Sequence, residues 1–179
     1  WGFAGIVSHA ISKPVIAALN GVTAGSGYQL ALLCDLRIGH AGVRIGQPEV
    51  RSGIPSITGM YLTWQSLGHS KTAEMMLTGR VLDAQEGRQL GLTHYVCDTA
   101  QGDTPAPDLA LQLAEKIAGN APLSNYAIVS AISRIADMSA TDGLFTEGLV
   151  MAMIQQGHDV QQRLGDFVHK KAHKVQLQR

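Results

Sequence analysis

One strand–turn–helix segment near the start of the chain constrains its fold more than any other feature. The apolar run Val15–Leu19 is followed by a glycine-rich stretch that ends at Gly27, and a helical pattern begins at Tyr28. A buried strand that leads through glycines into a helix presents free backbone N–H groups to a negative charge. The segment therefore predicts an α/β fold with an anion-binding turn.

The spacing of the glycines helps to decide whether the turn binds a phosphate group or an oxyanion. Gly21, Gly25 and Gly27 do not form the G-x-G-x-x-G pattern of dinucleotide sites, and no Lys-Ser/Thr pair follows as it does in nucleotide phosphate loops. Free N–H groups also stabilise an oxyanion that develops on a carbonyl during a reaction. The sequence therefore favours an oxyanion hole over a phosphate site.

Composition and charge narrow the class of partner. The 179 residues are 45% hydrophobic, which is enough for a packed core, and 14 basic residues balance 14 acidic ones. A net charge of zero argues against a nucleic-acid surface. No apolar run is long enough to cross a bilayer, and Cys34 and Cys97 have no metal-ligand spacing. We predict a cytoplasmic protein that binds neither nucleic acid nor membranes.

The sequence pattern changes near residue 100. The first hundred residues alternate strand and helix patterns, and a capping box, Asp83 with Glu86, begins one helix. A loop is expected at 53–59 and a helix break at Gly68. Further helices are predicted over 61–67, 71–77, 108–118, 123–138, 143–156 and 160–171. We therefore predict an α/β core over residues 1–100 and a helical region over residues 101–179.

Several motifs in order along the chain resemble the enoyl-CoA hydratase/isomerase (crotonase) family. They are Lys13–Gly21, the glycine turn, Leu30–Asp35, Gly46-Gln-Pro-Glu49, and Thr78-Gly-Arg80 followed by Ala84 and Gly91-Leu92. The resemblance implies a spiral of ββα units with a C-terminal helical trimerisation region. It also implies acyl-CoA substrates, a homotrimer or hexamer, and no separate cofactor, because coenzyme A is part of the substrate. The family's N-terminal part is expected to lie upstream of residue 1.

The resemblance assigns the oxyanion donors. Ser26 matches the middle residue of the family's glycine triplet, whose backbone N–H is one of two donors to the thioester oxygen. Gly25 and Gly27 flank it, and the resemblance implies that these three residues bind the substrate. Because the backbone supplies the donor, a serine is acceptable there if its φ is negative. The second donor belongs to a loop expected upstream of residue 1.

The resemblance also assigns the acid/base residue. The family's hydratases use two glutamates, whose positions correspond here to Gln29 and Glu49. Gln29 cannot accept a proton from water, so we expect isomerase-type chemistry, in which Glu49 moves a proton from C2 to C4 of a 3-enoyl thioester. The alternative for Glu49 is a turn cap or a partner of Arg51. Gln29 is expected either to donate a hydrogen bond to substrate or to be an inert helix residue.

Near the C-terminus, Lys170 resembles a family lysine that approaches the phosphates of coenzyme A, and a solvated basic tail is the alternative. His169 and His173 have ligand spacing, but a solvated helix face explains them better, so no metal site is predicted.

Two other functions stay open. A serine hydrolase would use Ser26 as its nucleophile, but Ala24 and Tyr28 stand where a G-x-S-x-G elbow has glycines. A non-catalytic acyl-CoA-binding or scaffold member of the family is also compatible with Gln29 and with the altered loop at 53–59.

Overall fold

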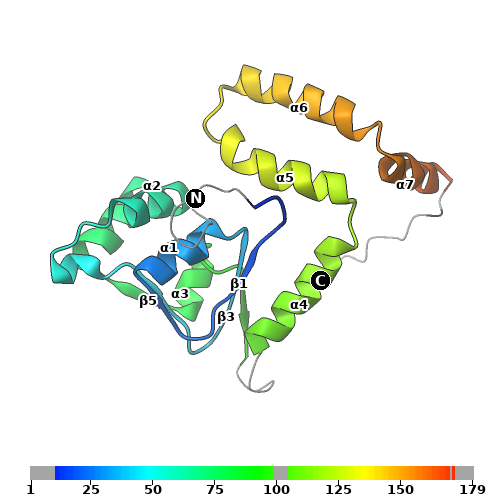
Figure 1. Cartoon of the computed structure of the whole chain (residues 1–179). Coiled ribbons are helices and arrows are strands. Elements are labelled where there is room, and N and C mark those ends of the chain that lie inside the picture. The colour runs from blue at the N-terminus through cyan, green and yellow to red at the C-terminus, as the bar shows by residue number, and fades with distance from the viewer. Residues whose placement is uncertain (1–10, 99–104, 170, 172–179) are drawn as a thin grey trace. The chain divides into compact units, whose positions relative to one another are not determined.

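The computed structural model describes residues 11–98, 105–169 and 171, and the chain divides into two compact units after Ile117. The first unit carries the strands and the second is helical (Figure 1). The domain boundary expected at residue 100 stays a prediction. Lys170 and His173 lie outside the described residues.

The first unit contains two small three-stranded sheets and the helices that pack on them. Its elements in chain order are β1 (Ile16–Ala18), β2 (Val22–Ala24), α1 (Ser26–Leu33), β3 (Leu36–His40), β4 (Arg44–Gly46), the 3-10 turn η2 (Glu49–Ser52), α2 (Ile57–Thr78), β5 (Val81–Asp83), α3 (Ala84–Gln89), β6 (Tyr95–Cys97) and α4 (Pro105–Ala118).

The first four strands alternate between the two sheets, and then β5 joins the second sheet and β6 the first. One sheet has the order β1-β3-β6 and is parallel throughout, with Ile16 opposite Leu36. The other has the order β2-β4-β5, in which β2 and β4 are parallel and β4 and β5 antiparallel. The Asp35 carboxylate accepts a 2.7 Å hydrogen bond from the Val15 N–H and so links the starts of β1 and β3. This topology leaves the β2–α1 turn near the chain that follows β4.

The core of the first unit fixes α1 against α2. Tyr28 is fully buried, and its hydroxyl lies 2.8 Å from Thr63 Oγ1 on α2. Thr63 donates its own proton to the Gly59 carbonyl, so Tyr28 is the donor of the pair. Burial raises the pKa of Tyr28 to about 12, which keeps the phenol protonated. The helix that follows the glycine turn is therefore held in place by a buried hydrogen bond.

A buried cation supports the other end of α1. The Arg37 guanidinium donates to the carbonyls of Ala31 and Cys34, at the C-terminal end of α1, and to that of Leu92. Cations are stabilised at helix C-termini, where carbonyls lack intrahelical partners. Burial lowers the pKa of Arg37, and the three carbonyls compensate for the loss of water.

Several local predictions are confirmed, and one is partly wrong. The helices expected on either side of Gly68 form α2, and Gly68 breaks the helical geometry with φ 70° and ψ −179°. The Asp83–Glu86 capping box is present at the start of α3. The loop expected over residues 53–59 is shorter, because α2 already begins at Ile57. The three-residue strands β2 and β5 were not predicted, since each is too short for a periodic signal.

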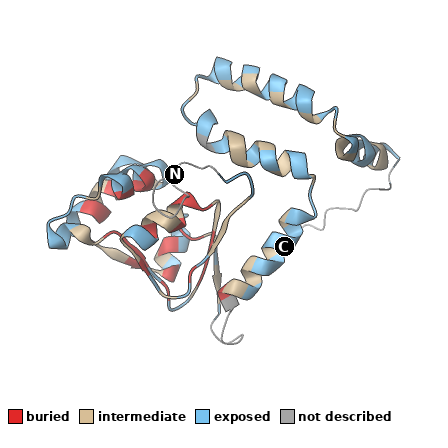
Figure 2. Ribbon diagram, in the orientation of Figure 1, coloured by how far each residue is buried: buried red, intermediate tan, exposed pale blue. Residues whose placement is uncertain are grey.

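The second unit consists of α5 (Pro122–Ile135), α6 (Ala140–Ile154) and α7 (His158–Val168), close to the predicted ranges. None of the side chains described in residues 118–169 is buried, whereas the first unit has a buried core (Figure 2). Among the described residues, none of the helices combines the length and apolar content that a membrane crossing requires.

Candidate active site

The glycine turn delivers unpaired backbone donors at the start of α1. Gly25 is the N-cap of α1 with φ 60° and ψ −128°, a conformation that favours glycine, and its carbonyl accepts from the Gln29 N–H at 3.1 Å. The first N–H groups of a helix have no intrahelical acceptor, and the first turn of α1 has no acidic side chain. Ser26 and Gly27 are exposed, and the φ of Ser26 is not positive, as the expected backbone donor requires.

Glu49 is held by a neighbouring amide. It is half-buried at the start of η2, and its Oε1 accepts a 2.5 Å hydrogen bond from Gln47 Nε2. Its other oxygen, Oε2, is buried and has no hydrogen-bond partner among the described residues. A buried carboxylate oxygen without a protein partner is a group that a substrate or a water molecule would satisfy. Glu49 thus has the features of an acid/base residue.

The carboxylate of Glu49 lies against the glycine turn. A Cβ added to Gly25 would be only 2.7 Å from Glu49 Oε1 and 3.5 Å from its Cδ. The two residues are far apart in sequence, and the parallel pairing of β2 with β4 brings the ends of these strands together. The structure therefore places the predicted base beside the predicted oxyanion donors.

Gln29 belongs to the same cluster through a residue that the sequence analysis did not single out. Gln29 Nε2 donates to Ser56 Oγ at 2.9 Å, and Gln47 Nε2 donates to the same oxygen at 2.7 Å. Gln47 is almost fully buried. A buried amide two residues before the candidate base was a signal that could have identified Gln47, but no sequence pattern pointed to Ser56.

The site fits a known family. A family model described as "Enoyl-CoA hydratase/isomerase" matches residues 8–176, almost the whole chain. The chain belongs to the enoyl-CoA hydratase/isomerase family.

Individual proteins named as enoyl-CoA or related hydratases are similar to the chain in sequence. A 2,3-dehydroadipyl-CoA hydratase from Escherichia coli (strain K12) is 34% identical over 164 residues, which cover 91% of this chain and 63% of that protein. A probable mitochondrial enoyl-CoA hydratase from Dictyostelium discoideum is 32% identical over 90% of this chain and 57% of its own length. The chain thus spans about six-tenths of the length of the curated relatives it matches.

Solved structures of the family confirm the predicted crotonase-like fold. An enoyl-CoA hydratase subunit I from Geobacillus kaustophilus HTA426 superposes with a TM-score of 0.86 at 26% identity, covering 94% of this chain and 64% of that one. An enoyl-CoA hydratase from Bacillus anthracis gives 0.84 at 29% identity, covering 93% and 63%.

Other interpretations of the site residues receive no support from contacts in the described part of the chain. No ion pair there joins Glu49 to Arg51, whose side chain instead lies close to Gly79. No described histidine is hydrogen-bonded to Ser26. His169 contacts the Gly165 carbonyl, and its candidate co-ligand His173 lies outside the described residues, so the absence of a metal site stays a prediction.

Proposed function

We propose that the protein containing this chain is an enzyme that acts on acyl-CoA thioesters, with Glu49 as its acid/base residue. Family membership supports the substrate class. The observation that carries the proposal is the close approach of the Glu49 carboxylate to Gly25, at the turn that carries the Ser26 N–H. A base and an oxyanion donor then face the same acyl group, with its C2 at the base and its carbonyl oxygen at the donor.

The reaction that a single carboxylate performs most simply is isomerisation. Glu49 removes a proton from C2 of a 3-enoyl thioester, and the electron pair moves onto the thioester oxygen. The Ser26 N–H and the N-terminal end of α1 stabilise this negative charge. Glu49 then returns the proton at C4, the double bond moves to C2–C3, and the product is a 2-enoyl thioester. No second base is required.

Gln29 is the reason to place isomerisation ahead of hydration. Its amide has no basic group, and in the structure it donates a hydrogen bond to Ser56. One of its two amide protons is therefore already committed within the protein, which leaves only the second as a donor to substrate. The substrate-binding role proposed for Gln29 rests on that remaining amide capacity.

Hydration is the second candidate, because the similar proteins named above carry the name hydratase. In that reaction Glu49 alone would take a proton from the water that bonds to C3, and the same carboxyl group would deliver a proton to C2. The two candidates differ in the substrate they consume, so substrate specificity separates them.

A panel of 2-enoyl-, 3-enoyl- and 3-hydroxyacyl-CoA esters tests the proposal with the full-length protein. We expect 3-enoyl esters to be converted to 2-enoyl esters faster than 2-enoyl esters are hydrated. Faster hydration would select the second candidate. Binding of the esters without any turnover would favour a non-catalytic family member. Labelling of Ser26 by a fluorophosphonate probe would favour a serine hydrolase.

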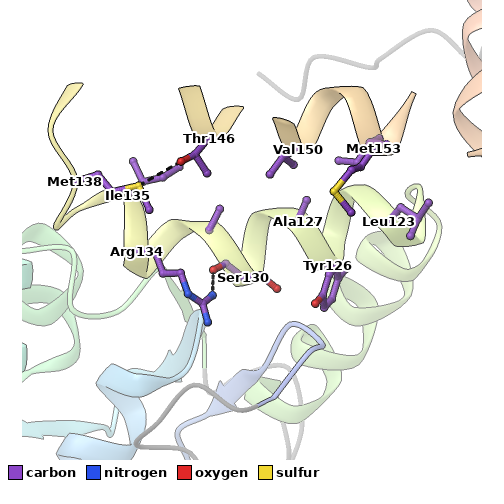
Figure 3. A pocket seen from close by; sticks show the side chains of 12 residues that line it. Leu123, Tyr126, Ala127, Ser130, Arg134, Ile135, Met138, Thr146, Val150 and Met153 are labelled. Carbon is purple, nitrogen blue, oxygen red and sulfur yellow. Dashed lines mark hydrogen bonds between the residues drawn. The ribbon is translucent and has the colours of Figure 1, made fainter. Parts of the chain in front are cut away.

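We also propose that the protein assembles into a trimer or a hexamer. An apolar cavity of about 310 Å³ lies between α5 and α6, and Tyr126, Ile135 and Met153 line it (Figure 3). Phe145, on α6, is also largely exposed. Helices with so much exposed apolar surface require a covering partner. Light scattering of the full-length protein should give a trimer or a multiple of it, and a stable monomer at micromolar concentration would contradict the proposal.

Two smaller expectations complete the proposal. A contact between Lys170 and the phosphates of coenzyme A rests on the family resemblance alone, because this residue is outside the described ranges. A cytoplasmic location rests on the sparse and scattered cysteines.

A further inference from the structure

Ser56 lies at the centre of the hydrogen bonds around the candidate base. Its Oγ is 2.9 Å from Gln29 Nε2 and 2.7 Å from Gln47 Nε2, and the same Gln47 nitrogen is 2.5 Å from Glu49 Oε1. A hydroxyl oxygen accepts two hydrogen bonds through its two lone pairs. Both acceptor positions of Ser56 are therefore filled by glutamine amides.

The Ser56 oxygen and the Glu49 carboxylate together hold the Gln47 amide in one orientation. The NH₂ group of Gln47 has two protons, one directed to Glu49 and one to Ser56. If the amide turned over, its carbonyl oxygen would meet the Glu49 carboxylate and repel it. Gln47 Oε1 has no hydrogen-bond partner among the described residues, so the contacts that hold the amide in the observed orientation are those of its NH₂ group with Glu49 and Ser56.

The backbone at Ser56 is unusual for a residue with a purely structural role. Ser56 has φ 42° and ψ 68°, and it is the single non-glycine residue with positive φ in the described ranges. It is the N-cap of α2, yet its side chain accepts no capping hydrogen bond from that helix. A serine at this position normally stabilises the helix through its hydroxyl. Here the hydroxyl oxygen instead accepts hydrogen bonds from Gln29 and Gln47. The backbone meanwhile has a left-handed conformation that is energetically unfavourable for serine.

The first turn of α2 is shaped around the same contact. A Cβ on Gly59 would lie 2.3 Å from Gln47 Oε1 and 3.0 Å from Ser56 Oγ. A glycine inside a helix lowers helix stability, so its presence there provides space at a local cost. The left-handed backbone of Ser56 and the absence of a side chain at Gly59 are thus both compatible with the hydrogen bond between Ser56 and Gln47.

We propose that Ser56 is a positioning residue of the active site, which orients the Gln29 and Gln47 amides and, through Gln47, fixes the Glu49 carboxylate beside the glycine turn. This inference rests on the proposed function, because it assigns to Ser56 an effect on the reaction at Glu49. Ser56 acts through the amides.

Ser56→Gly is the decisive variant, because it removes the hydroxyl and also relieves the left-handed strain. If the Ser56 hydroxyl had no role at the site, relief of the backbone strain would give a variant at least as stable and equally active. We expect unchanged or higher thermal stability, a kcat lower by about 10- to 100-fold, and a KM within about threefold of wild type, since a misplaced base weakens the transition state rather than ester binding. Unchanged kcat in a folded Ser56→Gly protein would overturn the inference.

The matched control is Ser52→Gly, an exposed serine at the end of η2 whose hydroxyl makes no hydrogen bond in the described structure. It should leave kcat unchanged, and a similar loss there would overturn a specific role for Ser56. Crystal structures of the full-length wild type and Ser56→Gly give a readout without turnover. The variant should lose the Gln47–Glu49 contact, and its retention would overturn the inference. Absence of wild-type turnover on every ester would instead refute the proposed function.

Discussion

Gly25→Ala tests whether the glycine turn and Glu49 form one site. The backbone of Gly25, with φ 60° and ψ −128°, is strained for any residue with a Cβ, at a cost of roughly 1–3 kcal/mol. The reduced freedom of the unfolded alanine chain offsets about 0.4–1 kcal/mol of this. We therefore expect the free energy of unfolding to fall by about 1–2 kcal/mol, as measured by urea denaturation of the full-length protein.

The effect of the same substitution on activity follows from a single contact. The added Cβ would lie 2.7 Å from Glu49 Oε1, and ordinary contacts begin at 3.4 Å, so the carboxylate must retreat by about 0.7 Å. A shift of this size in a reacting group costs roughly 10- to 100-fold in rate. We expect that loss in kcat, measured by steady-state kinetics on the preferred ester.

Gly21→Ala is the matched control, four residues before Gly25 in the same glycine-rich stretch. The φ of Gly21 is not positive, and an added Cβ meets nothing within 4 Å. Since alanine has less freedom than glycine in the unfolded chain, this variant should be more stable by about 0.4–1 kcal/mol and retain its activity. Equal activity of the Gly25→Ala and Gly21→Ala proteins would refute the argument that the turn and Glu49 act together.

Two further substitutions probe the cluster and the core. Gln29→Glu should increase hydration of a 2-enoyl ester, because the Ser56 hydroxyl, at 2.9 Å, can rotate to donate to the new carboxylate and hold it as a second base; an unchanged hydration rate would show that the missing base is not what limits hydration. Arg37→Leu leaves the buried carbonyls of Cys34 and Leu92 without the donor they have in the described structure, at about 1–3 kcal/mol each, while the Ala31 carbonyl keeps the Cys34 N–H. The substitution should lower the free energy of unfolding by at least about 2 kcal/mol in urea denaturation, and a loss below about 1 kcal/mol would contradict the account of Arg37.

Local sequence patterns were sufficient to predict several elements of the first unit. The β-branched and apolar run at 15–19, the break at Gly68 and the Asp83–Glu86 capping box each have a local physical cause, so each could be predicted. The strands β2 and β5 could not be predicted, because three residues are too few to show an alternating pattern. Each forms a strand by pairing with β4, which lies far from it in the sequence.

The hydrogen-bonded cluster around Glu49 could be predicted only in part from the sequence. Family motifs identified Glu49 and the turn at Ser26, but the contact of Glu49 with Gly25 arises only from the pairing of β2 with β4. Ser56 could not be predicted, since its left-handed backbone and its two amide partners are tertiary features. Sequence motifs thus identified candidate residues, and the fold identified their neighbours.

Glu49→Gln in the full-length protein tests the central claim most directly. The replacement amide keeps the size of the side chain and an oxygen that can accept from Gln47, so the fold and ester binding should be retained. Loss of a positioned general base typically costs about 10²–10⁴-fold in rate. We predict a loss in that range in the turnover of the preferred ester, with ester binding largely unchanged. Near-wild-type turnover by Glu49→Gln would contradict the assignment of Glu49 as the acid/base residue.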